Sequence, residues 1–452
     1  MIGVTDFYKN IFLSLLGWGV VALCLLLLAT DAASFIFHFY AFPALILIFF
    51  VFAYCCLGFY INRGFMLGAY FIIYYFSFLI VSCFFVESGA LMREIDKFGF
   101  PNGSLVLVVV FFIFAVEFGR FGYLFGSKVG GLVCPKIRGK WEQYFVYVTI
   151  FVSVSASLYL VFNYSSPFFK SMERVDFVAL YAPPWFGPIK SLVVQSFFLV
   201  AIVALSRQTT AYVKRWAWLA LVFYCFFAVV VFGEKFSLLN SFAMMFFLVF
   251  SSRNYRFSFR GMALFLIAAA VVVCLVVYVY ISNGRGVMFI FDRIALQAQV
   301  VWMYMNFSEA RGVYRASCLL GCDEWTSGAD VITSIILPEY LYKFYLDTGS
   351  ILSGFSPAIY LFFLGPISGA GLFCLVSFLL GFLQGCMAVQ IREGGIIFPF
   401  FIFKLYIALL LFLYMNDLGL FDNYLVMLAL FFVILMSMLA LVNRAFVRTV
   451  SG

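Results

Sequence analysis

A polar stretch from Asn283 to Ser356 carries the side chains best suited to chemistry in this sequence. Its cations are Arg285, Arg293, Arg311, Arg315 and Lys343. Arginine holds phosphate and carboxylate oxygens with two parallel hydrogen bonds, so several arginines near one another are typical of an anion site. The stretch also carries Asp292 and Glu339, and a carboxylate can take the proton of an attacking hydroxyl. We therefore predict a site for an anionic substrate here, with Arg285, Arg311 and Arg315 among its binding residues.

Two shorter segments between apolar runs add further cations. The first, 165–190, carries Lys170 and Arg174 four positions apart, and both are candidates to meet an anionic headgroup. The second is a short connection around Lys235, which lies beside the N-terminus of the following span, where free backbone N–H groups favour anions. Each segment also has a purely structural interpretation. Lys170 and Arg174 suit an interfacial helix with snorkelling cations, and Lys235 can pair with Glu234 in the turn.

The rest of the chain is apolar enough to lie in a membrane. Of its 452 residues, 66% are hydrophobic and 11% are charged. Many apolar runs exceed the length that crosses a bilayer, which predicts an all-α polytopic membrane protein with about twelve transmembrane helices. The predicted spans are 10–30, 43–61, 65–86, 104–126, 144–163, 190–206, 216–232, 237–251, 262–282, 357–388, 396–414 and 424–442. The chain thus divides into 1–282 with nine spans and a loop at 164–189, 283–356 as one large loop with amphipathic helices, and 357–452 with three spans.

The charge distribution predicts which ends of the spans face the cytoplasm. The net charge of +8 does not indicate a nucleic-acid partner, because the basic residues lie in short loops at span ends, where they set orientation. With a cytoplasmic N-terminus, every inside loop contains a cation and most acids lie on the other side. Both termini are then cytoplasmic. The segment 165–190, the connection around Lys235 and the stretch 283–356 all face outward.

Two parts of the large loop have patterns of their own. In 291–305, apolar residues recur at helical spacing, which predicts an amphipathic helix that lies on the membrane surface or caps a cavity. The segment 337–343 is aromatic, and Tyr340 suits the face of a sugar, with an interfacial aromatic belt as the alternative. Cys318 and Cys322 are the only cysteines of the loop, and whether they form a disulfide stays open.

Three charged side chains fall inside predicted spans, where charges are costly and therefore candidates for function. Glu117 and Arg120 are one turn apart, and Lys404 lies at a depth similar to that of Glu117. We expect a structural ion pair between Glu117 and Lys404 rather than a proton relay. The single histidine, His38, and the scattered cysteines lack metal-ligand spacing, so the sequence predicts no metal site.

The order of spans and outer loops along the chain can be compared with that of known membrane proteins. Many spans are followed by a middle-sized outer loop with Arg174, a short turn with Lys235, and a large outer loop that opens with arginines and closes near 354–357. This order resembles the Wzy-type O-antigen polymerases of Gram-negative inner membranes. The most specific local matches are VFGEKFSLLNSFAMMFFLVF, from Val231, and FDRIALQAQVVWMYMNF, from Phe291. The resemblance covers the whole chain in architecture and only these two patches in sequence.

The resemblance implies a glycosyltransferase-C-like membrane fold in the bacterial inner membrane and an enzyme that needs no metal or other cofactor. Its donor would be a growing glycan on undecaprenyl pyrophosphate, and its acceptor would be a second lipid-linked repeat unit. A polysaccharide chain-length regulator would be a further partner, and nucleic acid would not. The functional arginines of the family correspond to Arg174 and Arg293, which are therefore the expected catalytic cations.

The cations and carboxylates of the outer segments suit a transfer reaction that releases pyrophosphate. Without a metal, arginines and Lys235 must stabilise the charge that develops on the leaving pyrophosphate. Glu339 is the expected base for the acceptor hydroxyl, with Glu234 and Asp292 as rivals. A flippase or other transporter of lipid-linked oligosaccharides is one alternative, although it would have charges along a central path. An O-antigen ligase is another, but ligases use a histidine in the large loop, and 283–356 contains none.

Overall fold

The computed structural model describes most of the chain, with gaps at several loops. The described residues are 4–29, 41–133, 140–167, 169–170, 177–178, 180–205, 211–233, 237–252, 292, 294–306, 328–348, 352, 354–415, 426–435 and 437–438. Helices dominate this part of the chain, as predicted. Eight of the described helices are long and apolar enough to cross a membrane, which supports a polytopic helical membrane protein.

The helices match most of the predicted spans. In chain order they are α1 (Val4–Ala29), α3 (Ala41–Ile61), α4 (Arg63–Gly68), α5 (Tyr70–Glu87), α6 (Ser104–Val133), α7 (Lys140–Tyr164), α9 (Phe186–Leu205), α10 (Ala211–Val230), α11 (Ser237–Ser251), the 3-10 helix η2 (Leu296–Ala298), α14 (Gln299–Asn306), α15 (Gly328–Ile336), α16 (Glu339–Thr348), α17 (Ala358–Glu393) and α18 (Ile397–Met415). A shorter apolar helical segment, Val426–Leu435, falls in the twelfth predicted span. The ninth predicted span, 262–282, lies outside the described residues.

Two predicted spans have a different internal structure from a single straight helix. The third is divided at Ala69 into the short α4 and the longer α5. The tenth bends within α17, where Gly365 has a φ of 75° and Pro366 follows it. Proline removes a backbone donor and its ring clashes with the preceding turn, so a kink at this place has a local cause.

A small β-hairpin connects α5 to α6 and was not predicted. Strand β1 (Leu91–Met92) pairs antiparallel with β2 (Lys97–Phe98), with Leu91 opposite Phe98. Its apolar residues are too few for a period-two pattern to stand out from the neighbouring spans. The hairpin contributes to the site described below.

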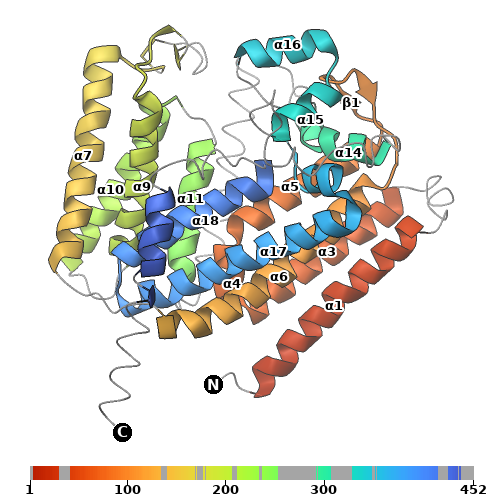
Figure 1. Cartoon of the computed structure of the whole chain (residues 1–452), viewed down its shortest axis with the longest axis horizontal. Helices are drawn as coiled ribbons and strands as arrows, with labels where there is room; N and C mark the ends of the chain where they lie inside the picture. The colour runs from red at the N-terminus through yellow and green to blue at the C-terminus, as the bar shows by residue number, and fades with distance from the viewer. Residues whose placement is uncertain are drawn as a thin grey trace.

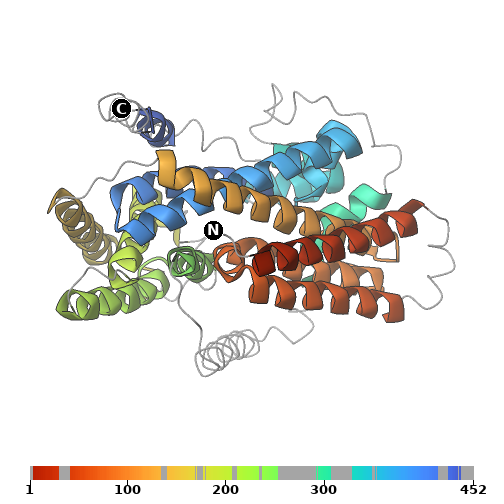
Figure 2. The same ribbon diagram turned by 90° about the horizontal axis from the view of Figure 1, so that it is seen from below.

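Helices α6 and α17 form the closest pair at the centre of the molecule and run side by side in both views (Figures 1 and 2). Glycines permit the contact. A Cβ at Gly122 or Gly126 would overlap the carbonyl groups of Phe378 or Phe382 on α17. In the other direction, a Cβ at Gly381 would overlap the carbonyl of Gly119. Small residues at such spacing let helix backbones approach in a membrane, where helices associate through packing.

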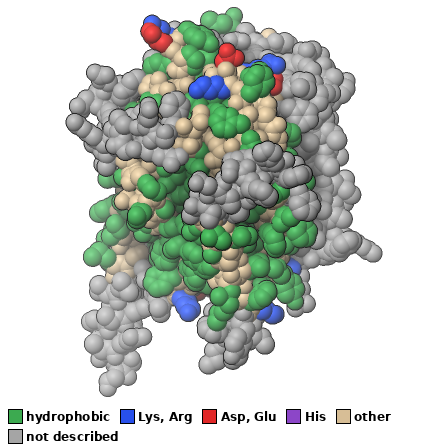
Figure 3. All heavy atoms as spheres, turned by 90° about the vertical axis from the view of Figure 1, so that its right-hand side faces the viewer, with side chains coloured by type: hydrophobic (Ala, Val, Ile, Leu, Met, Phe, Trp, Pro, Cys, Tyr) green, Lys and Arg blue, Asp and Glu red, His purple; other side chains and the backbone are tan. Residues whose placement is uncertain are grey.

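The described parts of 165–190 and 283–356, both predicted to face outward, lie toward one end of the molecule. In Figure 1, α14, α15, α16 and β1 lie at the upper right, and the C-terminal end of α7 also points upward, whereas α1 begins at the bottom. Figure 3 shows that, among the described side chains on one face, an apolar band separates two charged ends, and acids are visible only at the upper end. Which membrane side the upper end faces stays a prediction.

Candidate functional site

The first part of the polar site is the contact between α14 and the segment that connects α5 to α6. The indole Nε1 of Trp302 donates a hydrogen bond to the carbonyl of Phe100 over 2.9 Å. Asn102 Nδ2 donates to the carbonyl of Trp302, also over 2.9 Å. The rings of Phe100 and Trp302 meet edge to face, with centroids 4.9 Å apart. These contacts join residues 200 and 202 positions apart in the chain, and they place α14 over the start of α6.

Charged and amide side chains add to this contact. Arg93, in the hairpin, forms a salt bridge with Asp292, with 2.8 Å between Nη2 and Oδ2. Gln299 Nε2 donates a hydrogen bond to Glu94 Oε2 over 2.5 Å. The Asp292 side chain is 16% exposed and that of Arg93 60% exposed, so the pair lies at the edge of the contact. Asp292 immediately precedes Arg293 in the sequence, so the hairpin fixes the residue beside the expected catalytic arginine.

The connection is itself fixed by a buried carboxylate. Glu87, at the end of α5, is 2% exposed and accepts hydrogen bonds from Ser104 Oγ (2.7 Å) and from the backbone N–H of Leu105 (3.2 Å). Asn102 Oδ1 accepts a bond from the Ser104 backbone N–H (3.1 Å). A helix begins with unpaired N–H groups and a positive dipole end, so these acceptors stabilise the start of α6.

The two ends of the large loop meet at this site. Gly354 has a φ of +77°, and a Cβ there would overlap the carbonyl of Gln297. Only glycine combines this left-handed backbone with such a close approach. Next in the chain, the carbonyl of Ser356 accepts a hydrogen bond from Tyr75 Oη over 3.3 Å. The turn that closes the loop is thereby joined both to the segment before α14 and to α5.

The helix predicted for 291–305 is present in the described residues. The segment is helical from Ile294 through η2 and α14. Trp302, Ala295 and Ala298 are buried as expected from the apolar face. However, Gln299 is also fully buried. The helix is therefore packed against the polar end of the protein on most sides, while Gln297 is half-buried and Asn306 is exposed. Whether it lies on the membrane surface or caps a cavity stays a prediction.

The aromatic segment 337–343 leads into α16, which lies at the top of Figure 1. Glu339, the expected base, accepts a hydrogen bond from Lys343 Nζ over 2.8 Å, and both side chains are largely exposed. Tyr340 is 68% exposed. The side chains of Glu339 and Tyr340 are therefore exposed on α16, which lies at the upper end in Figure 1. Their roles stay predictions.

Lys170 lies at the end of the molecule to which the C-terminus of α7 points. Its ammonium is 3.1 Å from the centroid of the Tyr181 ring, a cation–π contact. Phe177, in the same segment, is buried against Phe186 at the start of α9. The segment thus packs on the spans through Phe177 while Lys170 stays exposed.

Most of the predicted cations lie outside the described residues. These are Arg174, Lys235, Arg285, Arg293, Arg311 and Arg315, and the rival base Glu234, His38, Cys318 and Cys322 lie there as well. Of the predicted site residues, the structure describes Glu339, Tyr340 and Lys170. The contacts that sequence reasoning missed are those of Arg93, Glu94 and Asn102. Their signal was a short run of polar residues between two spans.

A second polar cluster lies within the spans. Glu117 and Arg120 on α6 form an ion pair with 2.6 Å between Oε2 and Nη2, and both are at most 1% exposed. Glu117 also accepts hydrogen bonds from Tyr54 Oη (2.5 Å) and Ser14 Oγ (3.0 Å). Arg120 donates to Asn10 Oδ1 over 2.8 Å. This network pairs the two opposite charges and joins α1, α3 and α6, and it leaves Arg120 Nε without a partner among the described residues.

The predicted ion pair between Glu117 and Lys404 is therefore wrong. The i, i+3 spacing of Glu117 and Arg120 already brings opposite charges together on one helix face. Lys404 is half-buried on α18, with its ammonium 5.6 Å from the centroid of the Phe400 ring. Similar depth in the membrane does not by itself bring two helices together.

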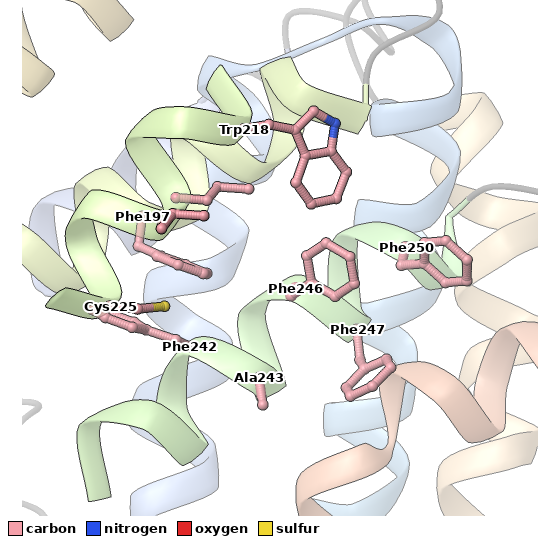
Figure 4. Close-up of a pocket in the computed structure, with 10 residues that line it drawn as sticks. Phe197, Trp218, Cys225, Phe242, Ala243, Phe246, Phe247 and Phe250 are labelled. Carbon is pink, nitrogen blue, oxygen red and sulfur yellow. The ribbon is translucent and has the colours of Figure 1, made fainter. Parts of the chain in front are cut away.

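An open groove of about 510 Å³ lies between α9, α10 and α11. Figure 4 shows that it is lined by aromatic and aliphatic side chains, among them Phe197, Trp218 and Phe246. Its lining contains neither a charged side chain nor a nucleophile other than Cys225. A groove of this kind suits contact with lipid chains and does not suit catalysis.

Nothing in the described residues suggests a metal centre, since no three of their His, Cys, Asp or Glu side chains are placed to share an ion. The polar end around α14, with its cations, carboxylates and amides, is the candidate site. No family model, no curated protein and no solved structure matches this chain.

Proposed function

We propose that this protein is an O-antigen polymerase, a metal-independent glycosyltransferase that acts on polyprenyl-pyrophosphate-linked glycans. The observation that carries the proposal is the anchoring of the segment FDRIALQAQVVWMYMNF, which resembles the polymerases, at the polar end of the helix bundle. Within it, Asp292 is tied to the hairpin through Arg93, and Trp302 is tied to the α5–α6 connection. A rigid support of this kind suits a segment that must hold a catalytic arginine in place.

In the proposed reaction, a hydroxyl at the non-reducing end of a new lipid-linked repeat unit attacks the anomeric carbon of the growing glycan. A bond forms between that carbon and the acceptor oxygen, and the bond from the carbon to the undecaprenyl pyrophosphate breaks. Arg174 and Arg293 stabilise the negative charge that develops on the departing pyrophosphate. Lys235, Arg285, Arg311, Arg315 and Lys170 bind the substrates, together with Tyr340.

The hydroxyl proton must go to a base. Glu339 is exposed, and its partner among the described residues is the exposed Lys343, so substrate binding can release its carboxylate. Asp292 is less suited, since Arg93 lies 2.8 Å from it and its side chain is mostly buried. We therefore retain Glu339 as the base and assign Asp292 a positioning role.

The proposal extends to the setting of the enzyme. The fold would be glycosyltransferase-C-like with about twelve spans, in the bacterial inner membrane with cytoplasmic termini and a periplasmic site. Its partners would be undecaprenyl-pyrophosphate-linked oligosaccharides and a chain-length regulator.

Lipopolysaccharide banding from a strain that lacks the gene tests the function. A polymerase defect leaves core lipopolysaccharide with a single repeat unit, and complementation restores the ladder. Loss of all O-antigen from the core would instead indicate a ligase or a flippase, and an unchanged ladder would refute all three functions.

A further inference from the structure

The apolar groove between α9, α10 and α11 continues toward the beginning of α10. A second hollow of about 450 Å³ lies there, and its lining residues are Arg215, Trp218, Leu219 and Val222. Trp218 and Val222 also line the first groove, so the two hollows form one extended groove. The four residues have the spacing i, i+3, i+4 and i+7, which places them on one face of α10. Among the described side chains that line the extended groove, Arg215 is the one that carries a charge.

The extended groove covers the depth of one membrane leaflet. The rings of Tyr212 and Trp216, both exposed, meet edge to face beside Arg215. Exposed tyrosine and tryptophan are typical of the membrane–water interface, so Arg215 lies at the level of the lipid headgroups. From Arg215 to Cys225, another lining residue, α10 rises about 15 Å, which is half of a hydrocarbon core roughly 30 Å thick.

The charges at the headgroup level favour an anion. Lys214, which is half-buried, is the neighbour of Arg215 in the chain. Helices α9, α10 and α11 contain no aspartate or glutamate, so the helices that form the groove supply no counter-charge. The first turns of a helix also attract anions, because backbone N–H groups are free there and the helix dipole is positive. Arginine binds phosphate oxygens with two parallel hydrogen bonds, so a phosphate group suits this place.

The apolar walls consist of rings that already pack on one another. The ring centroids of Trp218 and Phe246 are 5.8 Å apart, and Phe246 stacks on Phe250 at the same distance. Phe197 and Phe242 stack with centroids 4.1 Å apart. Figure 4 shows these side chains along the groove. Because the walls are packed before a ligand enters, an acyl chain can bind with little loss of side-chain freedom.

We propose that the extended groove binds an anionic phospholipid from the leaflet at the N-terminal end of α10, the side predicted to be cytoplasmic. The lipid phosphate lies at Arg215 and Lys214, and one acyl chain follows Trp218, Val222 and Cys225 into the membrane. The apolar lining matches the chain, and the two cations match a negative headgroup. The inference is independent of the proposed function, because the lining includes none of the proposed catalytic or substrate-binding residues.

Binding of defined lipids to the purified protein in a neutral detergent tests the headgroup contact. In native mass spectrometry, phosphatidylglycerol should bind at least about tenfold more tightly than phosphatidylcholine with the same acyl chains. The double change Lys214→Gln with Arg215→Gln should remove this preference. Lys128→Gln, at an exposed position near the end of α6, is the matched control and should keep it. Equal affinity of the unchanged protein for the two lipids, or a preference that persists in the double variant, would overturn the proposal.

A second pair of variants tests the position of the acyl chain. Val222→Trp, at a 67% exposed position, fills the groove and should weaken phosphatidylglycerol binding about tenfold. Val148→Trp, at a 60% exposed position on α7, should not weaken it. Phosphatidylglycerol with brominated acyl chains should also quench the fluorescence of the unchanged protein more than that of Trp218→Phe. Undiminished binding to Val222→Trp would refute the groove as the site, and displacement of phosphatidylglycerol by an equal amount of a polyprenyl phosphate would refute a phospholipid as its occupant.

Discussion

Arg93 and Asp292 form a salt bridge of 2.8 Å that ties the hairpin between α5 and α6 to the residue before Arg293. The two residues come from different parts of the chain, and neither belongs to a span. Arg93 also removes Asp292 as a competitor for neighbouring cations, because a paired carboxylate attracts a second cation less strongly. The pair therefore links the support of α14 to the proposed catalytic charge.

The first prediction follows from this pair. Arg93→Ala should shorten O-antigen chains in a strain that depends on the variant, because Asp292 is then free to move and to pair with Arg293. The pair is partly exposed, so the loss in stability should stay below about 1 kcal/mol. Chain length on a lipopolysaccharide gel and protein level on a blot separate the two effects.

Two variants control this experiment. The exchange Arg93→Asp with Asp292→Arg should restore part of the chain length that either single change removes, since the pair forms again. Lys97→Ala, at an exposed position on β2 of the same hairpin, should leave the ladder intact. Equal defects in the single and exchanged proteins would show that the pair itself is unimportant.

The second prediction concerns the ion pair inside the spans. Glu117→Leu leaves Arg120 buried without its counter-charge, which should destabilise the protein by about 3–5 kcal/mol. Replacing both residues, in Glu117→Leu with Arg120→Met, should recover most of that loss, because no unpaired charge remains. Thermal unfolding in detergent provides the measurement. A double variant that is stable but inactive would instead favour a proton relay.

The spans were largely predictable from the sequence because hydrophobicity alone determines them. Runs such as those in α3 and α6 exceed the length of a bilayer and admit few alternatives. The cations at their ends were equally visible. Local spacing also predicted the helix around Trp302, since apolar residues repeat there at helical intervals.

Contacts between distant segments were not predictable in this way. The hairpin at 91–98 contains only two paired residues in each strand, too short for any pattern. Nothing in the sequence relates Arg93 to Asp292, because their pairing depends on how α5, α6 and α14 pack. The wrong partner for Glu117 has the same origin, since depth along a helix does not specify its neighbours.

The third prediction tests the contact between α6 and α17. Gly126→Leu places a side chain where the carbonyl of Phe382 lies, so the two helices must separate along several turns. We expect a loss of at least about 3 kcal/mol and little folded protein in the membrane. Gly371→Leu, on α17 with open space at its Cβ position, should accumulate normally in the same assay. Similar levels of both variants would contradict the packing.

The fourth prediction concerns orientation. Tyr340 and Tyr212 have nearly equal exposed fractions, 68% and 69%, and lie on α16 and at the start of α10. In a background without native cysteines, Tyr340→Cys should react with a membrane-impermeant thiol reagent in intact cells, and Tyr212→Cys should react only after the membrane is opened. The reverse result would place the proposed site in the cytoplasm and exclude a periplasmic polymerase.

The last prediction concerns the two arginines on which the proposed chemistry depends. If Arg174 and Arg293 share the pyrophosphate, replacing either with Ala should abolish chain extension at normal protein level, since each lost contact costs about 2–4 kcal/mol in the transition state.

Four more substitutions refine that test. Arg174→Lys and Arg293→Lys should also abolish chain extension wherever the arginine makes two parallel hydrogen bonds, because an ammonium cannot provide them. Lys235→Ala should reduce extension more mildly as a single-point contact, and Arg253→Ala, predicted on the cytoplasmic side, should leave it intact. Normal ladders from both alanine variants, Arg174→Ala and Arg293→Ala, would remove the basis of the proposed site.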